Sequence, residues 1–316
     1  VPPLSEQRRI VAKLDELLAS SRSARAALDD VPALLDNYRQ SLLAAAFRGD
    51  LTRDWRDAQR SVTLDEHVPE GVRADAMPPI PETWRYVPVQ DVAEAGTSVT
   101  YGIVLPGPEV PGGVPYVRQQ DIEGGRVRTD ALGHTSTEIA AKHSRSELRQ
   151  GDVLLCIIRH LRVAVVPPGI DGANITQGTV RIRPAQFIDA HYLATFLESP
   201  AAQDWMKRCY IGMAMPRINV KDARAVPVAV PPLAEQREIM RRLAAAMTTI
   251  RARLEDTMPL RASLDALDAA VLHRAFTGML VPQDPRDEPA SALLARVRAA
   301  RIAPTRTLRR RAPASA

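Results

Sequence analysis

The sequence predicts an α+β protein in which a globular domain is flanked by two long helices that form an antiparallel, coiled-coil-like rod. Three observations predict this fold: a segment that occurs twice, heptad spacing within both copies, and strand-like sequence between them. The 316 residues divide into a first helical region (1–51), a linker (52–79), the globular domain (80–230), a second helical region (231–283) and a basic tail (284–316).

The two helical regions are copies of one segment. PPLSEQR at residues 2–8 returns as PPLAEQR at 231–237, and AFRGDL at 46–51 returns as AFTGML at 275–280. Repeats of this kind indicate that the same structural unit is built twice in one chain. A generic coiled coil would explain the helices but not these matched ends.

Each copy predicts a helix of about 40 residues, near 60 Å long at 1.5 Å per residue. Apolar positions step by four and three from Ile10 to Leu42 and, more weakly, from Ile239 to Val271. A lone rod with one apolar stripe is not stable in water. The two copies are therefore expected to pair with each other or with another chain.

Glycine and proline mark the expected limits of these helices. Gly49 and Gly278 lie where a left-handed residue commonly ends a helix. Pro32 and Pro259 lie inside the helical stretches, and each predicts a kink or a local break.

The insert, residues 80–230, loses the heptads and predicts a compact α+β domain. Residues 102–113 are expected to form a long loop, and a turn is expected at Gly124-Gly125, fixed by Asp121 and Glu123. Strands are expected at residues 153–158, 162–166, 179–183 and 226–230, and short helices at residues 189–198 and 201–209.

The charge of the chain is concentrated in its tail. The formal net charge is +5 and the pI about 9.5, but residues 284–316 carry eight arginines against three acids. The body is therefore close to neutral, and the basic pI alone is weak support for a nucleic-acid partner. Residues 290–301 predict a short helix and residues 303–316 disorder; a solvated tail is favoured over a phosphate-binding one.

Several protein classes are disfavoured. No apolar run approaches the roughly 20 residues of a membrane span, and no signal segment is recognised, so a cytoplasmic protein without a membrane partner is expected. Cys156 and Cys209 are expected to be buried thiols. The sequence lacks phosphate-loop, HExxH, nucleophile-elbow and adenine-methyltransferase motifs, so catalytic residues, a metal site and a bound cofactor are not expected.

The insert carries many side chains that could read DNA bases. Arginine suits guanine, and asparagine or glutamine suits adenine; most of these residues fall in or beside turns, where binding residues concentrate. The alternatives are solvated arginines and amides that cap turns. The candidates are Tyr101, Arg118, Gln119, Gln120, Arg126, Arg128, Arg159, His160, Arg162, Asn174, Thr176, Gln177, Arg217 and Asn219.

The PPL-x-EQ-R-x-I start of each long helix, closed by AF-x-G-x-L, resembles the conserved regions of type I restriction-modification specificity subunits. The insert resembles one of their target recognition domains. The matching pieces are PETW at 81–84, YVRQQDI at 116–122, GDVLL at 151–155 and MPRIN at 215–219.

The resemblance implies a sequence-specific subunit without catalysis that binds double-stranded DNA. Such a subunit directs methyltransferase (modification) and restriction (motor-nuclease) subunits to a split target, with the helices acting as a ruler. It implies no cofactor on this chain. S-adenosylmethionine would be bound by the methyltransferase partner, and ATP and Mg by the restriction partner.

The chain departs from this family in two ways. It has one recognition domain rather than two, so either a first domain is missing from this chain or the chain is a half-subunit that forms a homodimer on a palindromic target. Residues 159–162 also stand where a glycine turn is usual. The alternatives are a coiled-coil scaffold or inactive fragment without selective DNA binding, and an enzyme fused to a recognition domain.

Overall fold

The computed structural model describes residues 2–59 and 62–302, and its contacts group the chain into two compact units. Of the described residues, the helical unit contains 2–35 and 251–302, and the sheet unit contains 36–59 and 62–250. Each long helix is shared between the units, so they do not follow the five segments expected from sequence, whose boundaries stay a prediction.

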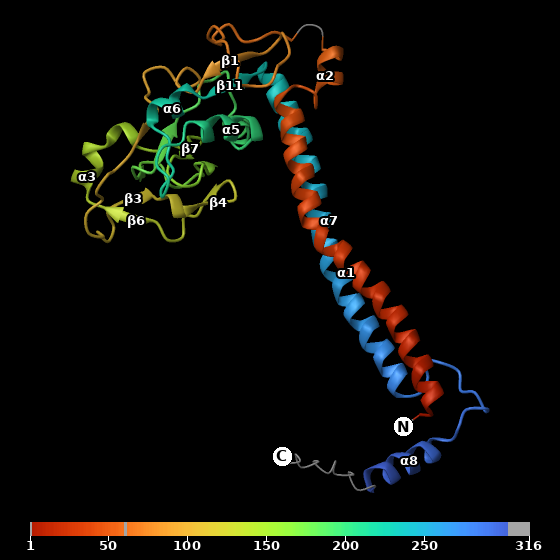
Figure 1. Cartoon of the computed structure of the whole chain (residues 1–316). Helices are drawn as coiled ribbons and strands as arrows, with labels where there is room; N and C mark the ends of the chain where they lie inside the picture. The colour runs from red at the N-terminus through yellow and green to blue at the C-terminus, as the bar shows by residue number, and fades with distance from the viewer. Residues whose placement is uncertain (1, 60–61, 303–316) are drawn as a thin grey trace, which may run out of the picture. The chain divides into compact units, whose positions relative to one another are not determined.

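The two expected long helices are present as α1 (Leu4–Phe47) and α7 (Leu233–Phe276), each of 44 residues (Figure 1). Gly49 and Gly278 follow them with φ of 80° and 76°, which confirms the left-handed ends. The expected local break at Pro32 and Pro259 is wrong, because both helices run through these residues. A proline removes one backbone hydrogen bond, and the flanking turns keep theirs.

Within the helical unit, α1 and α7 lie against each other in opposite directions. Arg25 forms ion pairs with Asp265 (2.6 Å) and Asp268 (2.8 Å), and Asp29 pairs with Arg261. The residue numbers rise along α1 as they fall along α7, which is the antiparallel order. The expected tail helix is present as α8 (Ala290–Ile302); the expected disorder of residues 303–316 falls outside the described residues.

The sheet unit contains three sheets. The six-stranded sheet has the order β2 (Thr100–Tyr101), β10 (Thr179–Ile182), β7 (Val153–Cys156), β8 (Val163–Val165), β5 (Arg126–Val127), β4 (Ile122–Glu123). The three-stranded sheet has the order β6 (Gly133–Thr135), β3 (Val114–Val117), β9 (Asn174–Ile175), and the two-stranded sheet pairs β1 (Arg85–Pro88) with β11 (Pro227–Val230). These strands confirm the four runs expected from sequence, each slightly shortened.

Short helices complete the sheet unit. They are α2 (Arg53–Ala58), α3 (Thr137–Lys142), α4 (Ala190–Leu197), α5 (Pro200–Arg208) and α6 (Val220–Ala225), with 3-10 turns η1 (Gln119–Asp121) and η2 (Ser144–Ser146). Helices α4 and α5 confirm the two helices expected at residues 189–198 and 201–209.

Strand β7 separates two apolar cores. Val153 and Leu155 pack into the larger core, whereas Leu154 and Cys156 pack into the smaller one. Successive side chains of a strand point to opposite faces of its sheet. A run of four buried apolar residues is therefore what a strand covered on both faces requires.

Described parts of the expected linker, within residues 52–59 and 62–79, contribute to the fold of the sheet unit, while the bounds of the linker stay a prediction. They contain α2, and Val68 and Met77 are buried in the larger core. Because this stretch is mostly polar, its sequence did not indicate that these few apolar side chains are buried.

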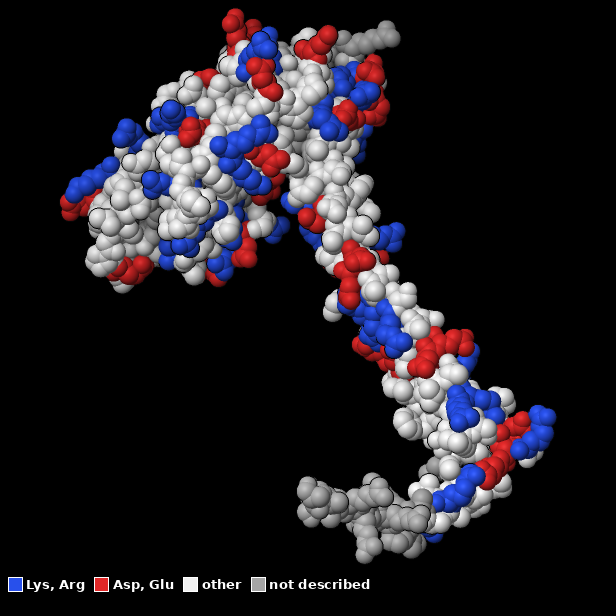
Figure 2. All heavy atoms as spheres, in the orientation of Figure 1, with Lys and Arg blue, Asp and Glu red and all other residues white. Residues whose placement is uncertain are grey.

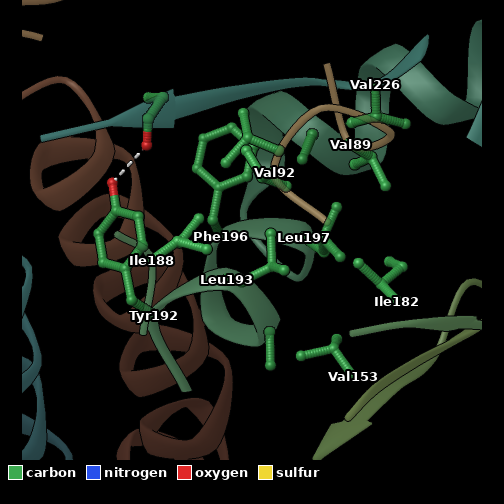
Figure 3. Packing of buried hydrophobic residues seen from close by; sticks show 14 of the residues in the cluster. Val89, Val92, Val153, Ile182, Ile188, Tyr192, Leu193, Phe196, Leu197 and Val226 are labelled. Atoms are coloured by element: carbon green, nitrogen blue, oxygen red, sulfur yellow. Dashed lines mark hydrogen bonds between the residues drawn. The ribbon is translucent and has the colours of Figure 1, made fainter. Parts of the chain in front are cut away.

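Within the sheet unit, helix α4 packs against the last turn of α1. The hydroxyl of Tyr192 donates a hydrogen bond to the Ala229 carbonyl at 2.7 Å (Figure 3). Phe47, at the last residue of α1, packs edge-on against Tyr192 and Phe196, with ring centroids 5.5 and 5.2 Å away. Edge-to-face aromatic pairs of this kind stabilise a core beyond the area they bury.

The first turn of α7 carries the repeated Glu-Gln pair and holds three segments together. The buried Glu235 carboxylate accepts hydrogen bonds from Thr52 Oγ1 (2.7 Å), Arg56 Nη1 (2.6 Å) and Trp84 Nε1 (2.9 Å). Gln236 donates to the carbonyls of Phe187 and Pro231 and accepts from the Asp189 amide. We call this hydrogen-bonded group of residues, centred on Glu235 and Gln236, the junction.

We expect Glu235→Gln to lower the free energy of unfolding by about 3 kcal/mol. It removes the charge that pairs with Arg56 and turns an amide NH2 toward buried donors. Urea denaturation measures the loss. Glu255→Gln, at an exposed site on α7, is the matched control and should change stability by less than about 0.5 kcal/mol. Equal stability of the two variants would contradict the role of the junction.

Candidate nucleic-acid interface

Eight of the fourteen candidate residues line a single recess of the sheet unit, with a volume of about 490 Å³. We call it the base recess. Its lining includes Arg118, Gln119, Gln120, Arg159, His160, Arg162, Thr176 and Gln177.

The recess forms because three connections end at one edge of the sheets. Strands β3 and β9 are parallel, so the segments that follow them, residues 118–120 and 176–178, leave the same edge. Thr179, at the start of β10, pairs with Cys156 at the end of β7. The β7–β8 connection, residues 157–162, therefore reaches that edge too.

Gln119 ties these connections together. Its Nε2 donates to the Ile158 carbonyl (3.0 Å) and to the Gly178 carbonyl (2.6 Å). A side chain on Gly178 would meet Gln119 at 2.9 Å, closer than real contacts allow. Gln119 is thus placed to position the recess, and a side chain at residue 178 would have to displace the Gln119 amide from these carbonyls.

Arg118 is likewise held by neighbouring groups. Its Nε and Nη2 donate to the two oxygens of Asp121 (2.9 and 3.1 Å), and Nη2 also donates to the Ala131 carbonyl (2.6 Å). The hydrogen bond to Asp121 raises the pKa of Arg118. Asp121 also accepts from the Arg118 amide, so its carboxylate closes the 3-10 turn η1 rather than the turn at Gly124-Gly125 where a role was expected for it.

Arg159 has a strained backbone. Its φ is 62°, the only positive φ of a residue other than glycine in the described parts of the chain. The left-handed conformation costs roughly 1–2 kcal/mol for such a residue. The Arg159 amide donates to the Pro216 carbonyl at 2.7 Å, and the amide of exposed His160 donates to the Ile158 carbonyl at 2.7 Å. The connection thus has the left-handed backbone that glycine adopts easily, but it places an arginine side chain in the lining of the base recess.

Arg162 and Arg128 border the same connections. Both are exposed; Arg162 Nη1 donates to the Ile122 carbonyl (3.1 Å) and Arg128 Nη2 to the Gln120 carbonyl (2.9 Å). Arg126 and Arg128 lie on the β4–β5 hairpin, whose turn at Gly124-Gly125 has φ of 56° and 77°. That turn confirms the one expected there.

The remaining exposed candidates lie outside the recess lining. The backbone of Arg217 pairs with Ile211 and bridges to Ile158, beside the β7–β8 connection. Asn219 precedes α6 without capping it through its side chain, and Tyr101 lies on β2. Solvent reaches all three side chains.

Asn174 is not an exposed candidate. It is 2% exposed, and its Oδ1 accepts from Ser146 Oγ (2.6 Å) and the Ile175 amide (2.9 Å). Its Nδ2 donates to the His143 carbonyl at 3.1 Å. The loop position suggested a reader, but these bonds make Asn174 a link between η2 and β9.

The recess has a local basic character. Its lining contains Arg118, Arg159 and Arg162 and, among the residues that the structure describes, no carboxylate. On the face shown in Figure 2, basic and acidic side chains are otherwise interspersed, as expected for a near-neutral body. A positive site thus arises by placement rather than by composition.

Sequence reasoning missed the backbone contributors to this site. Ile158 and Gly178 supply carbonyls to Gln119, and the Pro216 carbonyl holds Arg159. Such roles leave no side-chain signature. Cys156 also lines the recess, and burial raises the pKa of its thiol to about 11, so it stays protonated at neutral pH.

Within residues 2–59 and 62–302, no group of three or more His, Cys, Asp and Glu side chains is placed to hold a metal ion. In the same ranges no helix combines the length and apolar character of a membrane span.

Comparison with known sequences gives a consistent result. Residues 81–256 match the family described as the type I restriction modification DNA specificity domain. The chain is 32% identical to the EcoBI type I restriction enzyme specificity subunit of Escherichia coli, over 96% of this chain and 64% of that protein. It is 27% identical to the EcoDI subunit, over 96% and 68%. The chain thus spans about two thirds of these relatives' length.

Comparison with solved structures supports the fold. A structure described under complex assembly and conformational transition of the type I R-M system matches with a TM-score of 0.57 and 22% identity, over 89% of this chain and 61% of that one. The HsdS subunit from Thermoanaerobacter tengcongensis matches with a TM-score of 0.54 and 23% identity, over 89% and 60%.

We expect Arg159→Gly to be more stable than Arg159→Ala by about 1 kcal/mol. Glycine adopts φ of 62° without steric cost, whereas alanine keeps the strain of the native arginine. Urea denaturation of the two variants measures the difference. An alanine variant as stable as the glycine variant would show that this backbone position carries no strain.

Proposed function

The chain belongs to the family of type I restriction-modification specificity proteins, and from that premise we propose that it is the DNA-reading, non-catalytic specificity subunit of such an enzyme. The observation that carries the proposal is the base recess, where basic and amide side chains from separate connections converge without a carboxylate. Forked donors and acceptors of this kind recognise base edges in the major groove.

The recess supports a division of labour among its residues. The side chains of Arg118 and Gln119 donate hydrogen bonds to neighbouring groups of the chain, so they hold the connections that line the recess in place. Arg159, Gln120 and Gln177 are exposed, and no side-chain hydrogen bond ties them to the described residues, so they are free to read bases. Arginine would select guanine and glutamine adenine.

We assign the partners by family. Methyltransferase and restriction subunits would assemble on this chain in the cytoplasm, bringing S-adenosylmethionine, and ATP with Mg, respectively. Exposed apolar side chains on α7, among them Met258, Leu260 and Leu267, support a docking role for the helices. Helices of 44 residues have a contour of about 66 Å, near two turns of DNA, which suits a coiled-coil ruler between halves of a split target.

A second recognition domain would complete the split reader. The helical unit has a recess of about 670 Å³, lined in part by Glu6, Gln7 and Phe276. We call it the socket. These residues are the repeat counterparts of Glu235, Gln236 and Phe47.

The socket retains part of the junction's geometry. Gln7 donates to the Pro2 carbonyl (2.8 Å), as Gln236 does to Pro231 (2.9 Å). Phe276, however, is 89% exposed where Phe47 is 3% exposed. The Glu6 carboxylate has no hydrogen-bonded partner among residues 2–59 and 62–302, whereas the Glu235 carboxylate has three. A domain with the features of the sheet unit would supply what is lacking.

That second domain has two sources. In a homodimer a second copy of this chain would supply it, but the matching face of the copy, at Tyr192 and Phe196, already holds Phe47 of its own chain. This occupancy favours a different recognition domain over a second copy. A scaffold or inactive fragment, the remaining alternative, does not account for a recess lined with three arginines and no carboxylate.

A methylation map tests the function. The chain is co-expressed with a type I methyltransferase subunit, with and without a second chain that carries a different recognition domain, in a host without that activity, and modified adenines are located by sequencing. An interrupted motif is the expected outcome; an asymmetric one supports a different second domain, and a palindromic one supports a homodimer. An assembled complex that modifies no motif would refute DNA reading.

We expect Arg118→Ala and Arg217→Ala to weaken selective DNA binding roughly tenfold. Arg118 holds the connection that carries Gln120 in place, whereas Arg217 would contact DNA directly, where a contact with the right base is worth about 1–3 kcal/mol. Fluorescence anisotropy of the assembled complex at fixed salt, on cognate and scrambled duplexes, measures selectivity. Arg208→Ala, exposed on α5, is the control. Normal discrimination in both test variants would remove these residues from the interface.

We expect Phe276→Ala to leave unfolding unchanged within about 0.5 kcal/mol but to reduce methylation by weakening capture of the second domain. Phe47→Ala, its repeat counterpart, should instead cost about 3–5 kcal/mol of stability, because it empties a packed aromatic site. Denaturation and methylation assays of both variants separate the two roles. Full methylation by Phe276→Ala would contradict the socket.

A further inference from the structure

Arg181 is a buried cation without a counterion of its own. It is 3% exposed, on β10, where it pairs with Leu154 on the face of the smaller core. Its Nη2 donates to the carbonyls of Ser98 (3.2 Å) and Arg145 (2.9 Å). Its Nε is buried and finds no hydrogen-bond partner in the part of the chain that the structure describes. Burying such a charge is costly unless a partner completes the site.

Three further arginines surround it. Arg145, Arg149 and Arg183 line, with Arg181, a recess of about 320 Å³ that we call the cradle. Arg145 and Arg149 are exposed, and neither forms an ion pair with another described residue. Burial lowers the pKa of Arg181, and the charges of Arg183 and Arg149 lower it further.

Asp152, the carboxylate that acts most strongly on Arg181, is already engaged by other donors. Asp152 accepts from Arg183 Nε (2.8 Å) and Nη2 (2.9 Å), and its Oδ2 also accepts from the Arg149 amide. Glu147 lines the cradle and is exposed, and Glu94 also lies near enough to raise the pKa of Arg181, so with Asp152 three carboxylates face four arginines. The cradle therefore keeps an excess of positive charge.

The cradle is separate from the base recess. Gly178, just before β10, lines the base recess, whereas Arg181 lies three residues further along the strand. At about 3.3 Å per residue the two are roughly 10 Å apart. The cradle thus needs its own explanation.

We propose that the cradle binds a phosphate group. Guanidinium groups match phosphate oxygens in geometry and charge, and Thr97, Ser98 and Ser144, which also line the cradle, can add hydroxyl donors. A bound phosphate supplies the counterion that Arg181 lacks. Its source is either the backbone of DNA or free inorganic phosphate.

The experiment is thermal unfolding of the full chain in sodium phosphate against chloride of equal ionic strength. The wild-type melting temperature is expected to rise by roughly 3 °C when phosphate reaches ten times its dissociation constant. The variant Arg145→Ala with Arg149→Ala, which changes exposed side chains only, is expected to lose this shift. Arg208→Ala with Arg251→Ala, two exposed arginines elsewhere, should keep it.

An equal shift in the wild type and in the cradle variant overturns the proposal, and so does no shift in the wild type. In that case Arg181 serves only to join two carbonyls.

Duplex binding identifies the source once the shift is lost. If the cradle takes a DNA phosphate, its variant weakens binding equally on cognate and scrambled duplexes and reduces the salt slope by about 1–2. If duplex binding is unchanged, the ligand is free phosphate. The phosphate measurement uses no DNA, so it stands apart from the test of base reading.

Discussion

The structure depends on the buried carboxylate of Glu235. One carboxylate oxygen accepts hydrogen bonds from Thr52 and Arg56, which follow the end of α1. The other oxygen accepts a hydrogen bond from Trp84, which precedes β1. The adjacent Gln236 bonds to the segment before α4. Two neighbouring side chains at the start of α7 thus bind the segment after α1, the residue before β1 and the segment before α4. A buried charge is tolerated because three donors surround it.

The base recess shows how ordinary connections bring side chains from distant segments of the chain together. Parallel pairing of β3 and β9 brings two connections to one edge, and the register of β7 with β10 brings the third. Gln119 then joins them through backbone carbonyls. The rigid sheets set where the arginines stand, while the exposed side chains remain free for recognition.

Sequence alone predicts the elements well, because heptads, glycine ends and apolar runs are local signals. It predicts eight members of the recess for the same reason: they lie in connections beside strands. It fails for Asn174, which has the sequence context of a loop amide. In the structure the Asn174 side chain is buried and hydrogen-bonded to Ser146 and to the His143 carbonyl. It also fails to show that Arg118 is held by Asp121 rather than open to solvent. Burial and hydrogen-bond partners depend on segments distant in sequence, and no local pattern encodes them.

The backbone of Arg159 is held by a carbonyl from Pro216, not by its own side chain. Nearly every residue other than glycine and the β-branched ones would meet the same steric cost there. The side chain can therefore be exchanged without rebuilding the loop that presents it. Under the proposed function, single replacements at residue 159 would alter the recognised DNA sequence while the backbone of the connection stays the same.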